Sequence, residues 1–288
     1  MYSILFYNGM WGADAFKDIV FPPGFHITSD TAMLGKADAV VFHMPSLVIE
    51  KPIDKPDNQL WVFWSMESGK HYPRLMRPEV QAMFDLFLTY KLNSDVPVPY
   101  IEYELGQCLR QPPVEKTGDI CAFISSSFNQ SHRLQWLKEL MTELPVDSYG
   151  KVFNNKVIEN DNGLSTKMDI ISKYKFAIAF ENAIDEDYVT EKFYDPLIAG
   201  AVPVYLGAPN IDRFAPGDHC FIDAAGFKSP KELAACLRTL MANDHLYQEY
   251  LAWKQKPYRE TFQSLLDSKQ IHPFVKLCYK VEEILSGE

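Results

Sequence analysis

Residues 175–180 read KFAIAF, and a second largely apolar run, AVPVYLG, spans 201–207. Between them lies FENAIDEDYVTEK at 180–192, in which four of the first eight residues are acidic. Short apolar runs with little alternation are typical of parallel strands that helices cover on both faces. Ligands of such sheets bind beyond the carboxyl ends of the strands. The polar residues after 180 are therefore expected to belong to a binding site.

Apolar runs of the same kind recur at the spacing of alternating strands and helices. In the first half, strands are predicted at 3–7, 37–44, 60–66 and 85–90, and PEVQAMFDLF (78–87) supplies a helix. The Pro-rich interval GQCLRQPPVEKTGD at 106–119 is predicted to be a linker. The pattern then restarts, with strands at 120–125, 175–180, 201–207 and 220–227 and helices at 131–144, 165–174 and 229–244.

This order of segments predicts an α/β fold with two Rossmann-like domains that face each other across a cleft. A chain of 288 residues is long enough for two domains. We predict a first domain at 1–112, a second at 113–268, and a C-terminal amphipathic helix at 269–288 that packs back on the body. In that helix Phe274, Leu277 and Val281 share one apolar stripe.

Composition narrows the class of partner. A formal net charge of -10 argues against nucleic acid or an anionic membrane as the main partner. The five cysteines contain no CxxC pair and the seven histidines no HxH or HExxH pattern, which argues against a dedicated zinc site. No stretch reaches the roughly 18 apolar residues of a membrane helix, and MYSILFYNGMWG is typical of a strand rather than a signal peptide. A soluble, cytoplasmic protein is expected.

Lys192 and Glu191 follow the loop after the strand at 175–180 and precede a helix. Pro196 cannot donate a helical hydrogen bond, so the regular helix is expected to begin near it or to kink there. Unpaired N–H groups at a helix start, together with a lysine, form a good receptor for a diphosphate. An ordinary Glu–Lys surface pair at a capped helix start is the alternative.

Other candidate residues also follow predicted strands. Arg133 opens the helix after ICAFIS, where its guanidinium can grip a phosphate through two parallel hydrogen bonds or face water. Glu67 ends LWVFWSM, whose aromatics would partly desolvate its carboxylate and suit it to be a general base. A solvated carboxylate, with His71 as a rival base, is the alternative. The same criterion selects Ser125 and Tyr149.

The acidic loop supports two readings. Asn182 and Tyr188 can hydrogen-bond the hydroxyls of a sugar or ribose, or they can tie down the loop. Asp185 and Asp187 form a DxD pattern, which in some glycosyltransferases holds a divalent metal against a diphosphate. A solvated loop without metal is the alternative, because lysine and arginine side chains can supply the same electrostatic stabilisation.

These motifs together resemble the α-1,3/4-fucosyltransferases. FEN followed by DYVTEKFYDPLIAGAVPVYLGAPN (187–210) and F.P looks like the donor-site signature of that family. WVFWSMES (61–68) is similar to its strand ending in Phe-Glu-Ser-Pro, and TYKLNSDVPVPY (89–100) to its Thr-Tyr-Arg-x-x-Ser-Asp-x-Pro-x-Pro-Tyr segment. ISSSFNQSHR and DSYGK also match family elements, so the resemblance runs from about residue 60 to 227.

The resemblance implies a GT-B fold and inverting transfer of L-fucose from GDP-β-L-fucose to a GlcNAc- or N-acetyllactosamine-containing acceptor, in α-1,3 or α-1,4 linkage. It implies no obligatory cofactor or metal and leaves Mn²⁺ or Mg²⁺ open as a stimulant. Glu67 would be the catalytic base. The donor-binding residues would be Ser125, Arg133, Tyr149, Asn182, Tyr188, Glu191 and Lys192.

Two positions depart from the family pattern. Gly69 stands where the family usually has proline, and Ser126 replaces its usual asparagine. Without the membrane anchor or heptad repeats of other members, a bacterial-type enzyme acting in the cytoplasm on surface-glycan precursors such as lipopolysaccharide is expected. The alternatives are a metal-dependent glycosyltransferase that uses Asp185 and Asp187, and a non-catalytic protein that binds a nucleotide sugar.

Overall fold

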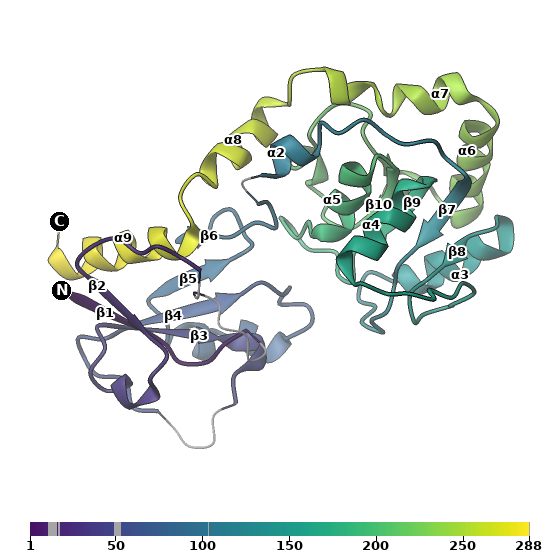
Figure 1. The fold of residues 1–288 in the computed structure, drawn as a ribbon. Coiled ribbons are helices and arrows are strands. Elements are labelled where there is room, and N and C mark those ends of the chain that lie inside the picture. The colour runs from purple at the N-terminus through teal and green to yellow at the C-terminus, as the bar shows by residue number, and fades with distance from the viewer. Residues whose placement is uncertain (11–15, 17, 49–52, 103, 288) are drawn as a thin grey trace. The chain divides into compact units, whose positions relative to one another are not determined.

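A computed structural model describes residues 1–10, 16, 18–48, 53–102 and 104–287 (Figure 1). The chain forms two compact units, the first of residues 1–99 with 269–288 and the second of residues 100–268. The boundary therefore differs from the predicted 112/113. Residues just after 100 belong to the second unit because Arg110 Nη1 donates to the carbonyls of Lys254 and Lys256, each at 2.7 Å.

The first unit is built on a six-stranded sheet in the order β2-β1-β3-β4-β5-β6, with parallel pairs throughout. Its strands are β1 (Tyr2–Phe6), β2 (Phe25–Thr28), β3 (Ala39–His43), β4 (Leu60–Ser65), β5 (Leu86–Thr89) and β6 (Val96–Pro97). The four predicted strands are confirmed. The edge strand β2 was not predicted because its four residues include no buried side chain.

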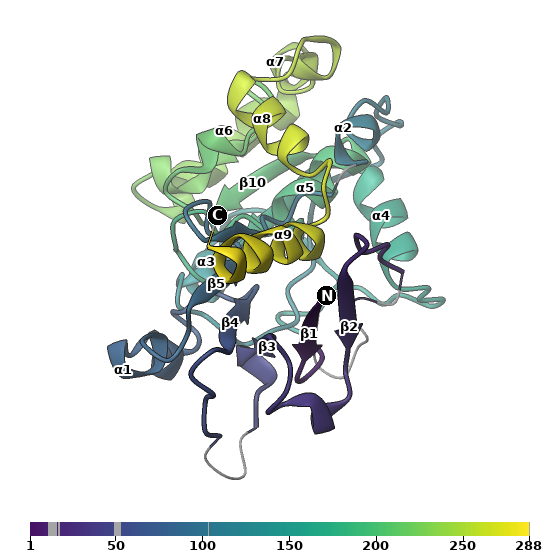
Figure 2. The same ribbon diagram turned by 90° about the vertical axis from the view of Figure 1, so that its left-hand side faces the viewer.

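The helices of this unit are short except at the C-terminus. They are α1 (Pro78–Gln81), α9 (Pro273–Ser286) and the 3₁₀ turns η1 (Thr31–Met33), η2 (Met44–Ser46) and η3 (Pro73–Met76). The segment predicted to be helical at 78–87 forms only one helical turn before β5 begins. As predicted, α9 packs on the sheet, where Phe274, Leu277 and Val281 are buried in its core (Figures 1 and 2).

The second unit holds a five-stranded parallel sheet in the order β11-β10-β9-β7-β8. Its strands are β7 (Gly118–Ala122), β8 (Asp147–Ser148), β9 (Tyr174–Phe180), β10 (Val202–Leu206) and β11 (Ile222–Asp223). Its helices are α2 (Leu105–Cys108), α3 (Arg133–Glu143), α4 (Leu164–Ser172), α5 (Glu191–Ala199), α6 (Pro230–Ala242), α7 (Asp244–Glu249) and α8 (Glu260–Ser268), with 3₁₀ turns η4 (Ile211–Arg213), η5 (Ala224–Gly226) and η6 (Ala252–Gln255).

Both sheets repeat one strand order. Numbered within its own unit, each contains the sequence 2-1-3-4-5, and the first adds a sixth strand at the edge. In sheets of this order a crevice opens at the carboxyl ends of strands 1 and 3, where the chain switches direction across the sheet. These switch points lie between β1 and β3 in the first unit and between β7 and β9 in the second. The predicted α/β class is confirmed, and the cleft between the domains stays a prediction.

Across the described residues, no helix combines the length and the apolar character that are needed to span a bilayer.

The first prediction concerns the docking of α9. Leu277 is fully buried in the core of the first unit, so Leu277→Ala should lower the free energy of unfolding by about 2–5 kcal/mol through lost burial and a residual cavity. Tyr279→Ala on the same helix is the control, since that side chain is 48% exposed. Urea denaturation of the whole chain measures both. Equal midpoints for the two variants would show that α9 does not stabilise this core.

The second prediction concerns His43, which ends β3 with a fully buried ring whose Nδ1 lies 2.6 Å from Ser46 Oγ. Burial lowers the pKa of His43 from 6.5 to about 4. As pH falls through 6.5, the His43 ring is protonated in the unfolded chain, whereas in the folded chain it stays neutral until about pH 4. Stability present above pH 6.5 should therefore be lost progressively down to pH 4.

Thermal unfolding of His43→Gln between pH 7 and pH 4 measures this loss. The variant should show a shallower decline than the wild type, whereas His26→Gln, at an exposed position of β2, should keep the wild-type slope. Parallel curves for the wild type and His43→Gln would contradict the assignment.

Candidate active site

The switch point of the second unit gathers most of the predicted residues. Glu181 and Asn182 directly follow β9, and the loop after β7 runs towards α3. Ser131 joins the two segments, because its Oγ donates to the Glu181 carbonyl at 2.5 Å and its N–H donates to the Asn182 carbonyl at 3.2 Å. The ends of β7 and β9 therefore form one connected polar surface.

Two alternatives were predicted for Pro196, a helix start near it or a kink in the helix; the first is wrong, and the kink stays a prediction. The helix begins at Glu191, and Pro196 lies inside it. Thr190 is the N-cap: its Oγ1 accepts from the Lys192 N–H at 3.4 Å, and its carbonyl accepts from the Phe193 N–H at 3.1 Å. The cap supplies partners for N–H groups that the sequence analysis expected to be unpaired. The binding capacity of this helix start therefore depends more on its side chains.

Lys192 is the central cation of this surface. Its Nζ lies 2.9 Å from Thr190 Oγ1, 3.1 Å from Glu191 Oε1 and 3.4 Å from Glu181 Oε2. Burial lowers the pKa of Lys192, but the charges of Glu181 and Glu191 outweigh burial and raise the pKa above its ordinary value. Lys192 therefore carries a full positive charge at neutral pH.

Glu181 is a further candidate for the site that was not selected from the sequence. Its side chain is fully buried, and its carboxylate accepts from Thr190 N–H at 2.8 Å and from Thr190 Oγ1 at 2.9 Å. Burial raises the pKa of Glu181, and the charge of Lys192 opposes that rise. A glutamate directly after the last strand residue, next to the selected Asn182, was the available signal. The sequence does not show that this side chain turns inward.

Arg133 lies at the same switch point but is more enclosed than predicted. Its side chain is 1% exposed, Nη1 donates to the Phe180 carbonyl at 3.2 Å, and Nη2 donates to the Ser126 carbonyl at 2.9 Å. Burial lowers the pKa of Arg133, against the charges of Glu181, Tyr188 and Glu191. The guanidinium thus ties the loop after β7 to the end of β9, and its contact with a phosphate stays a prediction.

The acidic loop is held by Asn210 rather than fully solvated. Asp187 adopts a left-handed φ of 63°, its N–H donates to Asn210 Oδ1 at 3.0 Å, and its Oδ1 accepts from Asn210 Nδ2 at 2.8 Å. The Asp187 carboxylate is therefore already engaged by an amide. No group of three or more His, Cys, Asp or Glu side chains suited to a metal was found among the described residues.

The remaining donor-site candidates border this surface. Asn182 is 9% exposed, and its Oδ1 is buried without a hydrogen-bond partner within the described chain. Tyr188 is 2% exposed. Tyr149 stacks on Phe123 with ring centroids 5.1 Å apart, while Ser125 Oγ accepts from the Lys151 N–H at 3.2 Å.

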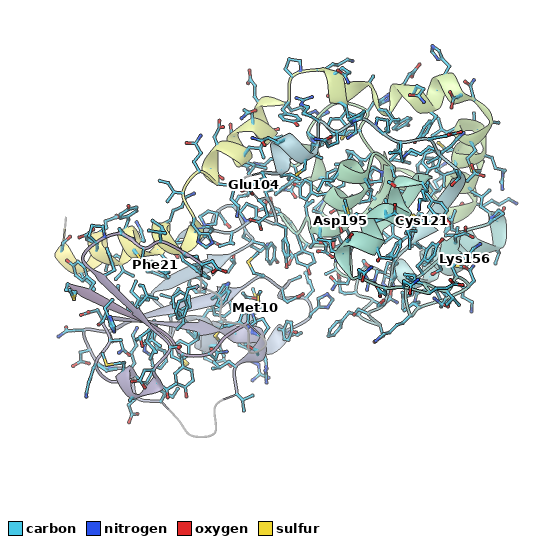
Figure 3. The ribbon with its side chains drawn as sticks, in the orientation of Figure 1. Met10, Phe21, Glu104, Cys121, Lys156 and Asp195 are labelled. Carbon is cyan, nitrogen blue, oxygen red and sulfur yellow. The ribbon has the colours of Figure 1, made fainter. Side chains whose placement is uncertain are left out.

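A second lysine lies next to Lys192. Lys167 on α4 pairs with Asp195 on α5 at 2.7 Å, and these residues, Lys192, Phe123 and Cys121 line a small cavity of about 20 Å³. Figure 3 labels Cys121 and Asp195 in this region. The space is large enough for about one water molecule, so any ligand group larger than a water molecule would have to bind outside it.

Glu67 lies in the first unit, two residues after β4, and lines a cavity of about 340 Å³. Most of the exposed wall is apolar, with contributions from Phe63, Tyr72 and Phe87, and polar side chains also line the cavity. Burial raises the pKa of Tyr72, and the charge of Glu67 raises it further. Both residues line this cavity. A half-buried carboxylate in a mostly apolar cavity is suited to accept a proton from a bound hydroxyl.

Comparison with known proteins identifies the family. Residues 4–101 match the model described as fucosyltransferase, N-terminal, and residues 113–286 match that of glycosyltransferase family 10 (fucosyltransferase), C-terminal part. A putative fucosyltransferase-like protein of Arabidopsis thaliana is 37% identical over 76% of this chain and 42% of its own length. The 4-galactosyl-N-acetylglucosaminide 3-alpha-L-fucosyltransferase 9 of Rattus norvegicus is 33% identical over 81% of this chain and 64% of its own length.

The fold matches as well. A crystal structure of an alpha1,3-fucosyltransferase with GDP-fucose superposes with a TM-score of 0.65 over 93% of this chain and 88% of that one, at 17% identity. The chain spans less than two thirds of the length of the curated relatives named above. The matched models cover both units, and the predicted family is confirmed. This chain belongs to the fucosyltransferases of glycosyltransferase family 10.

Proposed function

We propose that the chain is an inverting fucosyltransferase that moves L-fucose from GDP-β-L-fucose to a hydroxyl of a GlcNAc-containing glycan. Membership of the family supports the reaction, and the relative from rat is named for transfer to a 4-galactosyl-N-acetylglucosaminide. The observation that carries the proposal is the charged Lys192 at the start of α5, at the switch point of the second unit.

The donor side of the reaction needs stabilisation of a leaving diphosphate. When the bond between fucose C1 and the phosphate oxygen breaks, its electron pair stays with GDP, and negative charge grows on the diphosphate. Lys192 is the cation suited to stabilise that charge, with Arg133 behind it and the N-terminal end of α5 adding a partial positive charge. Glu191, whose carboxylate is 51% exposed beside Lys192, is suited to the positive charge that grows on the fucose ring.

The acceptor side needs a base. The acceptor oxygen attacks C1 from the face opposite the diphosphate, and its proton has to leave as the new bond forms. Glu67 is our candidate for this base, because its carboxylate lines a cavity whose aromatic walls suit the apolar faces of sugar rings. In this scheme the proton moves to Glu67, the configuration at fucose C1 inverts from β to α, and GDP leaves.

The reaction we propose does not need a metal ion. Asp187 of the DxD pattern already binds Asn210, and Lys192 and Arg133 carry the positive charge that a metal would otherwise supply. A stimulatory effect of Mn²⁺ or Mg²⁺ stays a prediction. So do the α-1,3 or α-1,4 linkage, the cytoplasmic location, and the role in lipopolysaccharide or other glycan synthesis.

The third prediction tests Glu67. Glu67→Gln keeps the size of the side chain but cannot accept the proton, so kcat for transfer should fall about 10²- to 10⁴-fold. GDP affinity, measured by calorimetry, should stay within about twofold because the variant leaves the second unit intact. Glu79→Gln, an exposed carboxylate of the same unit, should keep wild-type turnover. Full turnover in Glu67→Gln would exclude this residue as the base.

The fourth prediction tests Lys192. Lys192→Met removes the proposed hydrogen bond between the lysine ammonium and the diphosphate of GDP, so GDP should bind about 10- to 100-fold more weakly. The control is Lys173→Met, which removes an exposed lysine paired with Asp169 in the same unit. Calorimetric titration with GDP compares the variants after circular dichroism has shown that each is folded. Wild-type affinity in Lys192→Met would place the donor site elsewhere.

A further inference from the structure

Glu181 is fixed on three sides before any ligand binds. Its N–H donates to the Leu206 carbonyl of β10 at 2.8 Å, and its carbonyl accepts from Ser131 Oγ. Its carboxylate accepts from both the N–H and the hydroxyl of Thr190, which is the N-cap of α5. This carboxylate therefore cannot swing towards solvent, in contrast to Glu191, whose side chain is half-exposed.

The ammonium of Lys192 has three oxygen partners. Its Nζ donates hydrogen bonds to Thr190 and Glu191 and forms an ion pair with Glu181 at 3.4 Å. A phosphate that approaches this ammonium therefore competes with two carboxylates for its charge. Because Glu181 is fixed and Glu191 is half-exposed, Glu191 is the partner that can yield its place.

The charges around Glu181 balance. Arg133 on α3 and Lys192 on α5 supply two positive charges, and Glu181 and Glu191 supply two negative ones. Burial raises the pKa values of Tyr194 and Tyr205, and the charge of Glu181 is a further cause for both. The site therefore attracts a diphosphate less strongly than its two cations alone would.

We propose that Glu181 is a positioning residue of the donor site that holds Lys192 in place. By competing for the ammonium of Lys192, Glu181 lowers the affinity of the site for a nucleoside diphosphate. The lower affinity allows GDP to dissociate after transfer. The inference rests on the proposed function, since it requires Lys192 to bind the diphosphate. The direction of the change in GDP affinity distinguishes this role from a structural one. Removal of a purely structural residue would weaken GDP binding, whereas removal of a competitor tightens it.

The test is a double-mutant cycle read by calorimetric titration with GDP. Glu181→Gln keeps the size and one acceptor oxygen but removes the charge, so GDP should bind about tenfold more tightly, the effect of roughly one charged hydrogen bond. The inhibition constant of GDP in the transfer assay should fall in parallel. Asp169→Asn, which removes the carboxylate partner of the exposed Lys173, is the matched control and should leave GDP affinity unchanged.

The second arm asks whether Glu181 acts through Lys192. In the Lys192→Met background, Glu181→Gln should change GDP affinity by less than about twofold, because no ammonium is left to release. Tightening of equal size in both backgrounds would overturn the inference in favour of a general charge effect. Equal or weaker GDP binding in folded Glu181→Gln would overturn it outright.

A third variant keeps the inference testable if Glu181→Gln does not fold. Thr190→Val removes a different partner of the same ammonium, so GDP should again bind more tightly, and weaker binding would count against competition. If Lys192→Met alone leaves GDP affinity unchanged, the proposed donor site itself fails. If Lys192→Met weakens binding but Glu181→Gln and Thr190→Val do not strengthen it, only the role of Glu181 falls.

Discussion

A carboxylate without access to water must be paired, because the cost of leaving it charged and unpaired inside a protein is several kcal/mol. In this chain the constraint falls on Glu181, and the pairing organises the second unit. Thr190 and Lys192 satisfy the carboxylate, and the same two residues flank Glu191, the first residue of α5. The end of β9, the cap of α5 and the charge of the site are thus consequences of one buried interaction.

The two units use one topology for different chemistry. Each sheet contains the strand order 2-1-3-4-5, so each has a switch point at the carboxyl ends of its first and third strands. In the second unit that point holds buried charges of both signs. The first unit instead holds a mostly apolar cavity with a carboxylate, after the neighbouring strand β4. We infer that the second unit stabilises the negative charge of the leaving diphosphate. The first unit, in this scheme, binds the acceptor sugar and accepts its proton.

The strands were predictable where burial imposes a pattern on the sequence. KFAIAF and LWVFWSM lie inside their sheets, so both are mostly apolar, whereas β2 is a half-exposed edge and shows no such pattern. The start of α5 was mispredicted because Pro196 gave a stronger local signal than Thr190. A proline inside the last turns of a helix costs stability that packing can offset, since Pro196 is buried.

The position of a residue after a strand was enough to select candidates for the site. Lys192, Asn182 and Glu67 were selected in this way, and their roles stay predictions. The burial of Arg133 and the inward turn of Glu181 depend on contacts with residues that are distant in the sequence, such as the Phe180 carbonyl, and a single sequence does not contain that information.

Inverting transfer of fucose is tested most directly by identifying the product of one reaction. The chain is incubated with GDP-β-L-fucose and N-acetyllactosamine, and the product is analysed by mass spectrometry and by the anomeric proton coupling in NMR. We expect release of GDP and a trisaccharide that carries α-linked fucose on GlcNAc. Fucose in β linkage, or GDP release without any fucosylated product from a panel of GlcNAc-containing acceptors, would contradict it.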